Sequence, residues 1–200
     1  MHISEGVLEP KILIAGAIVS AIVVIYAIKT LKSDDIPKVS AFSAFFFLAS
    51  FIHIPLGITS VHLILNGIVG AILGIRAFVA IFVALLLQGI LFGYGGITTL
   101  GVNLFILATP ALLGWLLFNL HCKERWQKQI VWFCIGFVPI AFGAILLSSI
   151  LFLNGDSFAV VAKIAIIGHI PIMLVEGVIT LLALNFIEKV KPSFFETEEI

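Results

Sequence analysis

The sequence has little charge, and this scarcity excludes an ordinary soluble domain. Asp, Glu, Lys and Arg together make up 11% of the 200 residues, whereas about 25% is usual in soluble domains. Hydrophobic residues make up 62%, and the mean hydropathy is +1.26. A soluble domain of this size leaves a large share of its surface in water and could not bury so much apolar area. We therefore expect an integral membrane protein surrounded by the lipid bilayer.

A basic excess, paired cysteines and catalytic motifs are also missing. The 11 basic and 11 acidic residues cancel, so we expect no nucleic-acid partner. Cys122 and Cys134 lack C-x-x-C spacing, and their expected place near the cytoplasmic face argues against a disulfide framework. The motifs G-x-x-x-x-G-K-S/T, H-E-x-x-H and G-x-S-x-G do not occur. We therefore expect no enzyme, no bound cofactor and no ATP bound by this chain, which leaves downhill transport or partner subunits that supply energy.

Seven apolar runs predict transmembrane helices, because about 20 apolar residues are needed to cross the bilayer as a helix. They cover residues 12–28, 39–54, 61–75, 77–93, 101–118, 130–153 and 159–187. We expect an all-α integral membrane protein of about seven transmembrane helices, with residues 1–200 forming a single transmembrane domain. Its parts are an extracellular N-terminal segment (1–10), a helical bundle (12–187) and a cytoplasmic tail (188–200). Gly70 and Gly74 form a G-x-x-x-G pair, which predicts close helix packing inside the bundle.

The basic residues predict the orientation, because cytoplasmic loops of membrane proteins carry an excess of Lys and Arg. With seven spans and an outer N-terminus, nine of the eleven basic residues are cytoplasmic, and only Lys11 and Lys163 lie outside. The cytoplasmic set is Lys29, Lys32, Lys38, Arg76, Lys123, Arg125, Lys128, Lys189 and Lys191. The N-terminus is therefore expected outside and the C-terminus in the cytoplasm. The first ten residues lack the basic region that begins a signal peptide, so the mature chain is expected to begin at Met1.

Four of the five histidines fall in outer segments or within spans: His2, His53, His62 and His169. The fifth, His121, falls in a cytoplasmic loop, where a solvated side chain is the simplest interpretation. Several imidazoles gathered toward one face favour a borderline-soft divalent ion such as Ni²⁺, Co²⁺, Cu²⁺ or Zn²⁺. For each of these histidines taken alone, a hydrogen-bonded structural role is the commoner alternative.

His2 differs from the others because it is the second residue of the chain. The Met1 amine, the amide nitrogen of His2 and its imidazole can close two fused chelate rings around one ion. Three nitrogens in a plane suit Ni²⁺ or Cu²⁺, and a fourth nitrogen from another histidine would complete a square. On the residues alone, His53, His62 and His169 remain alternatives for that fourth ligand.

Two further groups of polar residues each have two interpretations. Glu176 and His169 are seven residues apart, which places them on one face of the last helix. A carboxylate within the membrane must be paired or protonated, so these two residues make either a structural polar contact inside the bundle or a proton relay. Thr98, Thr99 and Asn103 lie at the outer start of the fifth span. They either cap that helix or support a neighbouring imidazole.

Four strings, in order along the chain, carry a resemblance to a known family. They are Met1-His-Ile-Ser-Glu-Gly-Val-Leu8, His53-Ile-Pro-Leu-Gly-Ile-Thr-Ser-Val-His-Leu-Ile-Leu-Asn-Gly67, Gly95-Gly-Ile-Thr-Thr-Leu-Gly-Val-Asn103 and Gly168-His-Ile-Pro-Ile-Met-Leu-Val-Glu-Gly177. The chain resembles the CbiM/NikM family, the substrate-binding membrane components of energy-coupling-factor (ECF) transporters for cobalt and nickel. The resemblance extends from residue 1 to about residue 192, and the four strings together are highly specific. One departure is Ser4, where many members carry proline, and it removes no ligand.

The resemblance implies a seven-helix bundle with the extracellular N-terminal segment folded into it. It also implies that Co²⁺ or Ni²⁺, as the transported substrate, is held by the Met1 amine, the amide and imidazole of His2, and the imidazole of His62. The sequence leaves cobalt and nickel as alternatives. The residues expected to support these ligands without binding the ion are His53, Asn66, Thr98 and Asn103.

The resemblance further implies partners: a transmembrane coupling protein and cytoplasmic ATP-binding subunits, assembled in the plasma membrane of a prokaryotic cell. Some members carry a fused C-terminal domain. Because this chain ends at Ile200, any small accessory membrane subunit is expected as a separate chain. Two alternatives stand beside this interpretation. One is a self-sufficient proton-coupled permease with Glu176 and His169 as proton carriers, and the other is a structural membrane subunit without a ligand.

Overall fold

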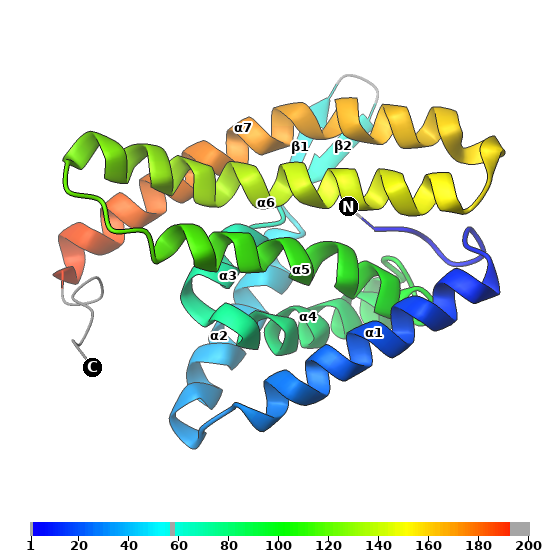
Figure 1. Cartoon of the computed structure of the whole chain (residues 1–200), viewed down its shortest axis with the longest axis horizontal. Coiled ribbons are helices and arrows are strands. Elements are labelled where there is room, and N and C mark those ends of the chain that lie inside the picture. The colour runs from blue at the N-terminus through cyan, green and yellow to red at the C-terminus, as the bar shows by residue number, and fades with distance from the viewer. Residues whose placement is uncertain (1, 57–58, 193–200) are drawn as a thin grey trace.

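A computed structural model describes residues 2–56 and 59–192, with backbone alone for residues 53–56 and 59–61. The described chain is almost entirely helical (Figure 1). The helices are α1 (Pro10–Lys29), α2 (Ile36–Ala49), α3 (Asn66–Leu73), α4 (Ala77–Phe92), α5 (Leu100–Phe118), α6 (Arg125–Leu153) and α7 (Ala159–Val190). Short 3-10 turns cover Ser33–Asp35, Gly74–Arg76 and Asp156–Phe158, and the strands are β1 (His53–Leu56) and β2 (Thr59–His62).

Five helical stretches of the described chain are long and apolar enough to cross a membrane. They are Pro10–Lys29, Asn66–Phe92, Leu100–Phe118, Arg125–Leu153 and Asp156–Val190. The predicted limits of the first, fourth, fifth and seventh runs lie within three residues of helices α1, α4, α5 and α7, and α6 begins five residues earlier than predicted. The prediction of a multi-pass helical membrane protein is therefore confirmed.

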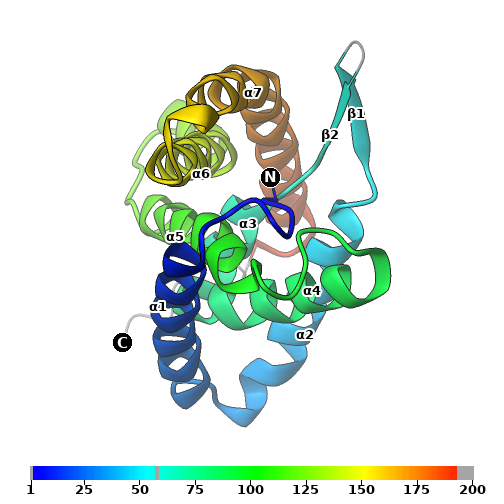
Figure 2. The same cartoon turned by 90° about the vertical axis from the view of Figure 1, so that its right-hand side faces the viewer.

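The second and third predicted spans, 39–54 and 61–75, are wrong in their limits. Helix α2 ends at Ala49 and α3 has only eight residues, so at 1.5 Å per residue they are about 21 and 12 Å long, shorter than the roughly 30 Å core of a bilayer. Between them, β1 and β2 form an antiparallel hairpin that stands out from the helices (Figure 2). Hydropathy does not report strand pairing, so the two predicted runs extended to residues 54 and 61 and overlapped the ends of this hairpin.

Helix α3 runs beside α5 and then turns back into α4. The Asn66 side chain contacts Leu107 at the start of α3, and Gly74 lies against Trp115 at its end. The turn that follows α3 carries Arg76, whose guanidinium forms an ion pair with Asp35 at 3.1 Å, just before α2. Helix α2 therefore starts, and helix α3 ends, at the same end of the bundle.

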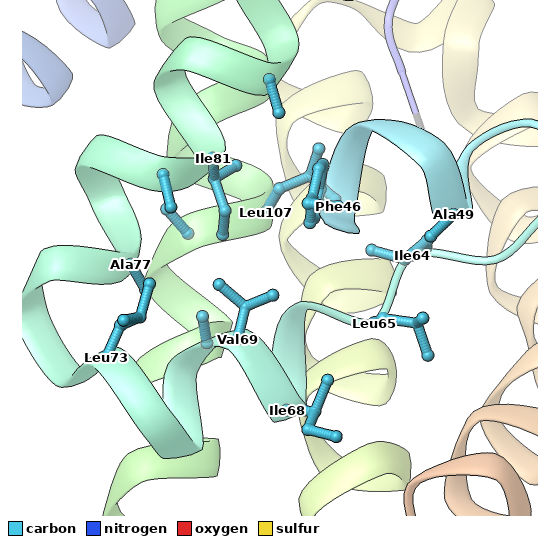
Figure 3. Packing of buried hydrophobic residues seen from close by; sticks show 14 of the residues in the cluster. Phe46, Ala49, Ile64, Leu65, Ile68, Val69, Leu73, Ala77, Ile81 and Leu107 are labelled. Carbon is cyan, nitrogen blue, oxygen red and sulfur yellow. The ribbon is translucent and has the colours of Figure 1, made fainter. Parts of the chain in front are cut away.

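Buried hydrophobic side chains such as Ile68, Val69 and Leu73 hold α3 inside the bundle (Figure 3), and its glycines bring it close to two neighbouring helices. A Cβ atom added to Gly67 would lie 1.9 Å from the carbonyl oxygen of Ile135 on α6, and one added to Gly70 would lie 1.8 Å from that of Ala111 on α5. Only glycine permits such an approach. The predicted close helix packing is therefore present at Gly70, the first glycine of the G-x-x-x-G pair.

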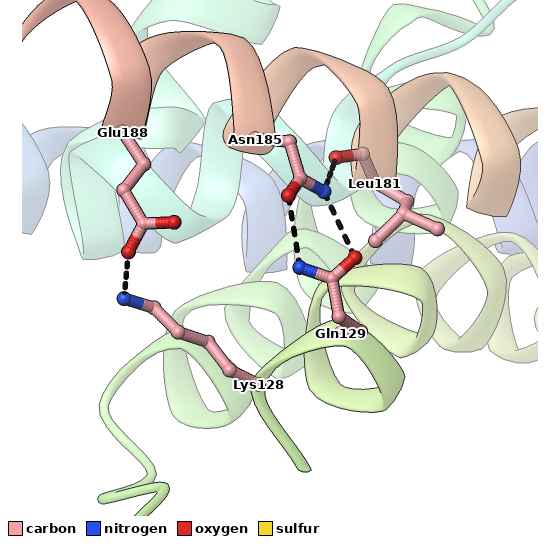
Figure 4. A network of polar contacts seen from close by, with 5 residues as sticks. All are labelled: Lys128, Gln129, Leu181, Asn185 and Glu188. Carbon is pink, nitrogen blue, oxygen red and sulfur yellow. Dashed lines mark hydrogen bonds and ion pairs between the residues drawn. The ribbon is translucent and has the colours of Figure 1, made fainter. Parts of the chain in front are cut away.

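Polar contacts join the start of α6 to the end of α7 (Figure 4). Gln129 and Asn185 exchange two amide hydrogen bonds of 2.8 and 3.1 Å, and Lys128 forms an ion pair with Glu188. The Asn185 amide also donates to the Leu181 carbonyl oxygen of its own helix at 2.7 Å. These bonds fix the register of the two longest helices, which lie side by side along their length (Figure 1).

Candidate metal site

The N-terminal segment turns back from the start of α1 toward the centre of the bundle, near α3 (Figure 2). The backbone N–H of Ile3 donates to Asn103 Oδ1 at 2.8 Å, and Asn103 Nδ2 donates to the Ile3 carbonyl oxygen at 3.0 Å. Asn103 Nδ2 also reaches Thr99 Oγ1 at 3.1 Å. Both ends of the Asn103 amide thus hold the residue next to His2, so this predicted supporting residue acts on the backbone and not on an imidazole.

A second asparagine, Asn154 at the end of α6, holds the segment farther along in the same manner. Its Oδ1 accepts the backbone N–H of Glu9 at 2.8 Å, and its Nδ2 donates to the Val7 carbonyl oxygen at 2.8 Å. Between these two points, the Thr98 backbone N–H donates to Glu5 Oε1 at 3.0 Å, a bond that lowers the pKa of Glu5. Sequence reasoning missed Asn154. Its only sequence signal is an asparagine followed by a glycine at a predicted helix end.

The segment places His2 against His62. The two imidazole rings stack with their centroids 5.1 Å apart and an angle of 21° between their planes. Both ring nitrogens of His2 are buried, and neither has a hydrogen-bond partner among the described residues. Burial lowers the pKa of His2 well below its ordinary value of 6.5, and the neighbouring His62 acts in the same direction. The His2 imidazole is therefore neutral at neutral pH, which is the form that binds metal ions.

Strand β2 ends at His62, and the next carbonyl group orients the ring. His62 Nδ1 lies 2.8 Å from the Leu63 carbonyl oxygen. In the neutral imidazole, the ring nitrogen that faces a carbonyl oxygen carries the proton, and Nε2 then keeps the lone pair. Histidines that bind metal ions commonly donate their other ring N–H in this way. The geometry thus prepares Nε2 of His62 as a donor to an ion.

The other residues predicted to bind or support the ion form no hydrogen bond to the imidazole pair through a described side chain. The hairpin register sets the backbone of His53 opposite His62, while the His53 side chain lies outside the described residues, as does the whole of Met1. Asn66 Nδ2 donates to the Leu107 carbonyl oxygen at 2.8 Å and Thr98 contributes its backbone N–H, so neither bonds to an imidazole.

His169 and Glu176, the two polar residues of α7 singled out from the sequence, bond to other groups and not to each other. His169 Nδ1 bonds to the carbonyl oxygen of Ala165 in its own helix at 2.6 Å, and the Glu176 carboxylate accepts the backbone N–H groups of Ile64 and Leu65. In the part of the chain that the structure describes, no three His, Cys, Asp or Glu side chains gather as a metal cluster. Backbone and terminal nitrogens near His2 are candidates for further donors to an ion at the imidazole pair.

The fold and this site define a multi-pass membrane protein that buries two nitrogen donors beside its own N-terminus. A family model described as "Cobalt uptake substrate-specific transmembrane region" (CbiM) matches residues 2–194. The chain therefore belongs to the CbiM family, which confirms the resemblance carried by the four sequence strings.

Individual relatives agree with this assignment. A Haemophilus influenzae protein named as a metal transport protein is 36% identical over 203 residues, which cover 100% of this chain and 98% of that protein. A protein of Archaeoglobus fulgidus named as a fused nickel transport protein, NikMN, is 28% identical over 203 residues, covering 98% of this chain and 68% of its own length. The crystal structure of a truncated transition metal transporter matches with a TM-score of 0.74 at 26% identity, over 94% of this chain and 99% of that one.

Proposed function

We propose that this protein is the substrate-binding membrane component of a Co²⁺ or Ni²⁺ importer, and that Met1, His2 and His62 hold the ion. The observation that carries the proposal is the stacking of the His2 and His62 imidazoles, with both ring nitrogens of His2 buried. The neutral His2 imidazole beside the imidazole of His62 suits a borderline-soft divalent ion. Membership of a cobalt uptake family and the likeness to a nickel transport protein support the choice of metal.

The proposed donor set combines the chain's first two residues with one distant side chain. The Met1 amine, the deprotonated amide of His2 and one imidazole nitrogen of His2 close two fused chelate rings. Nε2 of His62 supplies the fourth nitrogen, since Nδ1 is engaged by the Leu63 carbonyl group. Four nitrogens near one plane favour Ni²⁺ geometry and also accept Co²⁺.

Uptake against a gradient needs energy that this chain has no motif to supply. We propose that a transmembrane coupling protein and cytoplasmic ATP-binding subunits supply it, as in ECF transporters, and that the ion enters from the outer face where the N-terminus is displayed. A small accessory membrane subunit is proposed as a separate partner. The complex is proposed to work in the plasma membrane of a prokaryotic cell.

The position of the first amine gives the sharpest test. Adding one glycine before Met1 moves the amine and breaks the fused chelate, so Co²⁺ and Ni²⁺ binding to the purified protein, measured by calorimetry, should fall at least 100-fold. His62→Ala should have a comparable effect, while His121→Ala, in an exposed loop, and a tag placed at the C-terminus should have none. Unchanged affinity in the extended protein would refute the proposed ligand set.

A further inference from the structure

The side chain of Glu176 on α7 is fully buried, and its two oxygens bond to backbone far away in the sequence. Oε1 accepts the N–H of Ile64 at 2.5 Å and that of Leu65 at 3.0 Å, and Oε2 lies 2.9 Å from the Leu65 nitrogen. These three contacts join α7 to the short segment between β2 and α3. Both backbone groups belong to residues two and three positions after the proposed ligand His62.

The segment that Glu176 holds needs such a partner. Residues 63–65 are buried irregular backbone, and inside a membrane every N–H of such backbone must be satisfied by protein. Leu65 has a φ of +57°, the only positive value at a non-glycine residue among the described positions. This left-handed conformation is strained for a branched side chain. Its persistence requires that the surroundings hold it in place.

Glu176 also replaces a missing helix cap. Leu65 occupies the N-cap position of α3 and has no side-chain group that could cap the helix. A carboxylate at the N-terminal end of a helix is favourable, because the backbone N–H groups there carry partial positive charge. The cap is thus supplied by another helix, and α3 can start only where α7 puts the carboxylate.

The position of Glu176 is in turn fixed by α6. A Cβ atom at Gly136 would lie 2.2 Å from the Glu176 carbonyl oxygen, which shows how closely α6 and α7 approach. Toward the site, only Leu63 separates His62 from the two residues that Glu176 binds. The Leu63 carbonyl orients the His62 ring, and the Leu63 N–H donates to the Ile52 carbonyl oxygen at 3.0 Å.

We propose that Glu176 is a positioning residue for the metal site: its carboxylate holds the backbone of Ile64 and Leu65 so that His62 faces His2 in the geometry that binds the ion. This inference rests on the proposed function and deepens it. It assigns to Glu176 a role in substrate affinity, and it replaces the proton-carrier role that the permease alternative requires.

The test compares Glu176→Gln and Glu176→Ala with Thr180→Val. Thr180 is the matched control, because it is buried one turn farther along α7 and its hydroxyl has no hydrogen-bond partner among the described residues. Loss of a group that orients a metal ligand typically costs 10- to 100-fold in affinity. We expect a loss of about 10-fold for Glu176→Gln, which keeps one acceptor oxygen, about 100-fold for Glu176→Ala, and less than about twofold for Thr180→Val.

Two further readouts separate positioning from general stability. In the metal-free protein, hydrogen exchange followed by mass spectrometry should accelerate over residues 62–66 in both Glu176 variants, while α5 and α6 stay protected. In the loaded protein, the d–d absorption bands of Co²⁺ or Ni²⁺ should shift, because His62 no longer meets the ion at the same angle. The circular dichroism spectrum confirms that each variant is folded.

The outcomes are distinct. Wild-type affinity with unchanged absorption bands in folded Glu176→Ala would overturn the inference, and so would loss of transport with unchanged affinity, which is the result expected of a proton carrier. If the wild-type protein itself binds no Co²⁺ or Ni²⁺, the proposed function fails. The exchange measurement on metal-free protein would still show whether Glu176 holds residues 62–66.

Discussion

His2 and His62 reach the candidate site by different routes, and the difference predicts how protons compete with the ion. His2 arrives on a segment held by hydrogen bonds of its neighbour Ile3, and its own ring nitrogens are buried without partners among the described residues. His62 arrives at the end of a strand with one nitrogen already engaged. A metal ion must displace protons from whichever nitrogens carry them at the working pH.

We expect metal affinity to fall as the pH is lowered from about 7.5 to about 5. The terminal amine, with an ordinary pKa of about 7.7–8.0, is the first donor to be lost. Because burial lowers the pKa of His2, its imidazole stays neutral below pH 6.5 and contributes only at the acidic end of this range. Calorimetry with Ni²⁺ at half-unit pH steps should show this two-part loss. An affinity that is independent of pH would mean that oxygen or sulfur ligands hold the ion.

Sequence reasoning selected candidate residues from the chemistry of their own side chains. His2, His62 and Asn103 are three of these candidates, and the structure brings them to one place. It could not identify the partners of Glu176, because they are backbone N–H groups more than 100 positions away. Every residue except proline has such a group, so nothing in the sequence marks the ones that are used.

The N-terminal segment is also held through backbone groups, which the sequence does not mark. Two asparagines make these bonds. Each of Asn103 and Asn154 makes two hydrogen bonds to the segment. A net contribution of about 0.5–1.5 kcal/mol per bond makes each asparagine worth about 1–3 kcal/mol. The segment is therefore tied to the bundle more strongly than an ordinary chain terminus, which is usually poorly ordered.

Replacing these asparagines should release the segment and weaken metal binding. We expect Asn103→Ala, next to His2, to lower Ni²⁺ affinity by about 10- to 100-fold and Asn154→Ala to lower it less, about 3- to 10-fold. Asn119→Ala is the control, because its amide bonds only to Trp115 of its own helix. Affinity is measured by calorimetry, with proteolysis of the segment as a check. Equal effects of all three variants would contradict this order.

Helix α3 gives a prediction about stability, because its backbone touches the carbonyl groups of α5 and α6. Gly67→Ala and Gly70→Ala would place a methyl group within 2 Å of Ile135 and Ala111 carbonyl oxygens, so each should destabilise the protein by about 1–3 kcal/mol or more. Gly168→Ala is the matched control in α7, since its Cβ meets nothing within 4 Å and alanine favours helix. Melting temperatures in detergent measure the difference. An unchanged melting temperature for Gly67→Ala would show that α3 is not packed as described.

The limits of the long helices could be predicted from the sequence, but those of α2, the hairpin and α3 could not. The long helices are continuous apolar runs bounded by polar loops, which is the pattern that hydropathy detects. The hairpin takes up the end of one predicted run and the start of the next, with its Pro-Leu-Gly turn signal between them. Helix α3 begins directly after Leu65. The backbone of Leu65 is in the left-handed conformation, which no property of leucine predicts. Tertiary packing therefore decides this part of the fold.

For the whole molecule, the ion pair between Arg76 and Asp35 places the start of α2 and the end of α3 at one end of the bundle. Because it joins the turn after α3 to the residues before α2, the segment between them enters and leaves at that end. An odd number of spans, such as the predicted seven, puts the two chain termini on opposite sides of the membrane. We therefore expect the nine basic residues of the predicted cytoplasmic set to lie on one face, as the excess of basic residues in cytoplasmic loops requires.

This arrangement predicts the outcome of cysteine labelling in intact cells. In a protein with Cys122 and Cys134 replaced by serine, a membrane-impermeant maleimide should label Ser4→Cys in intact cells and Lys191→Cys only after the cells are permeabilised. Both positions are exposed, so a difference in labelling reports the side of the membrane and not burial. Ser4 also lies two residues from His2, which means that a label on it marks the face from which the site would take its ion. If Lys191→Cys were labelled in intact cells and Ser4→Cys were not, the site would open to the cytoplasm, and the protein could not capture metal from outside.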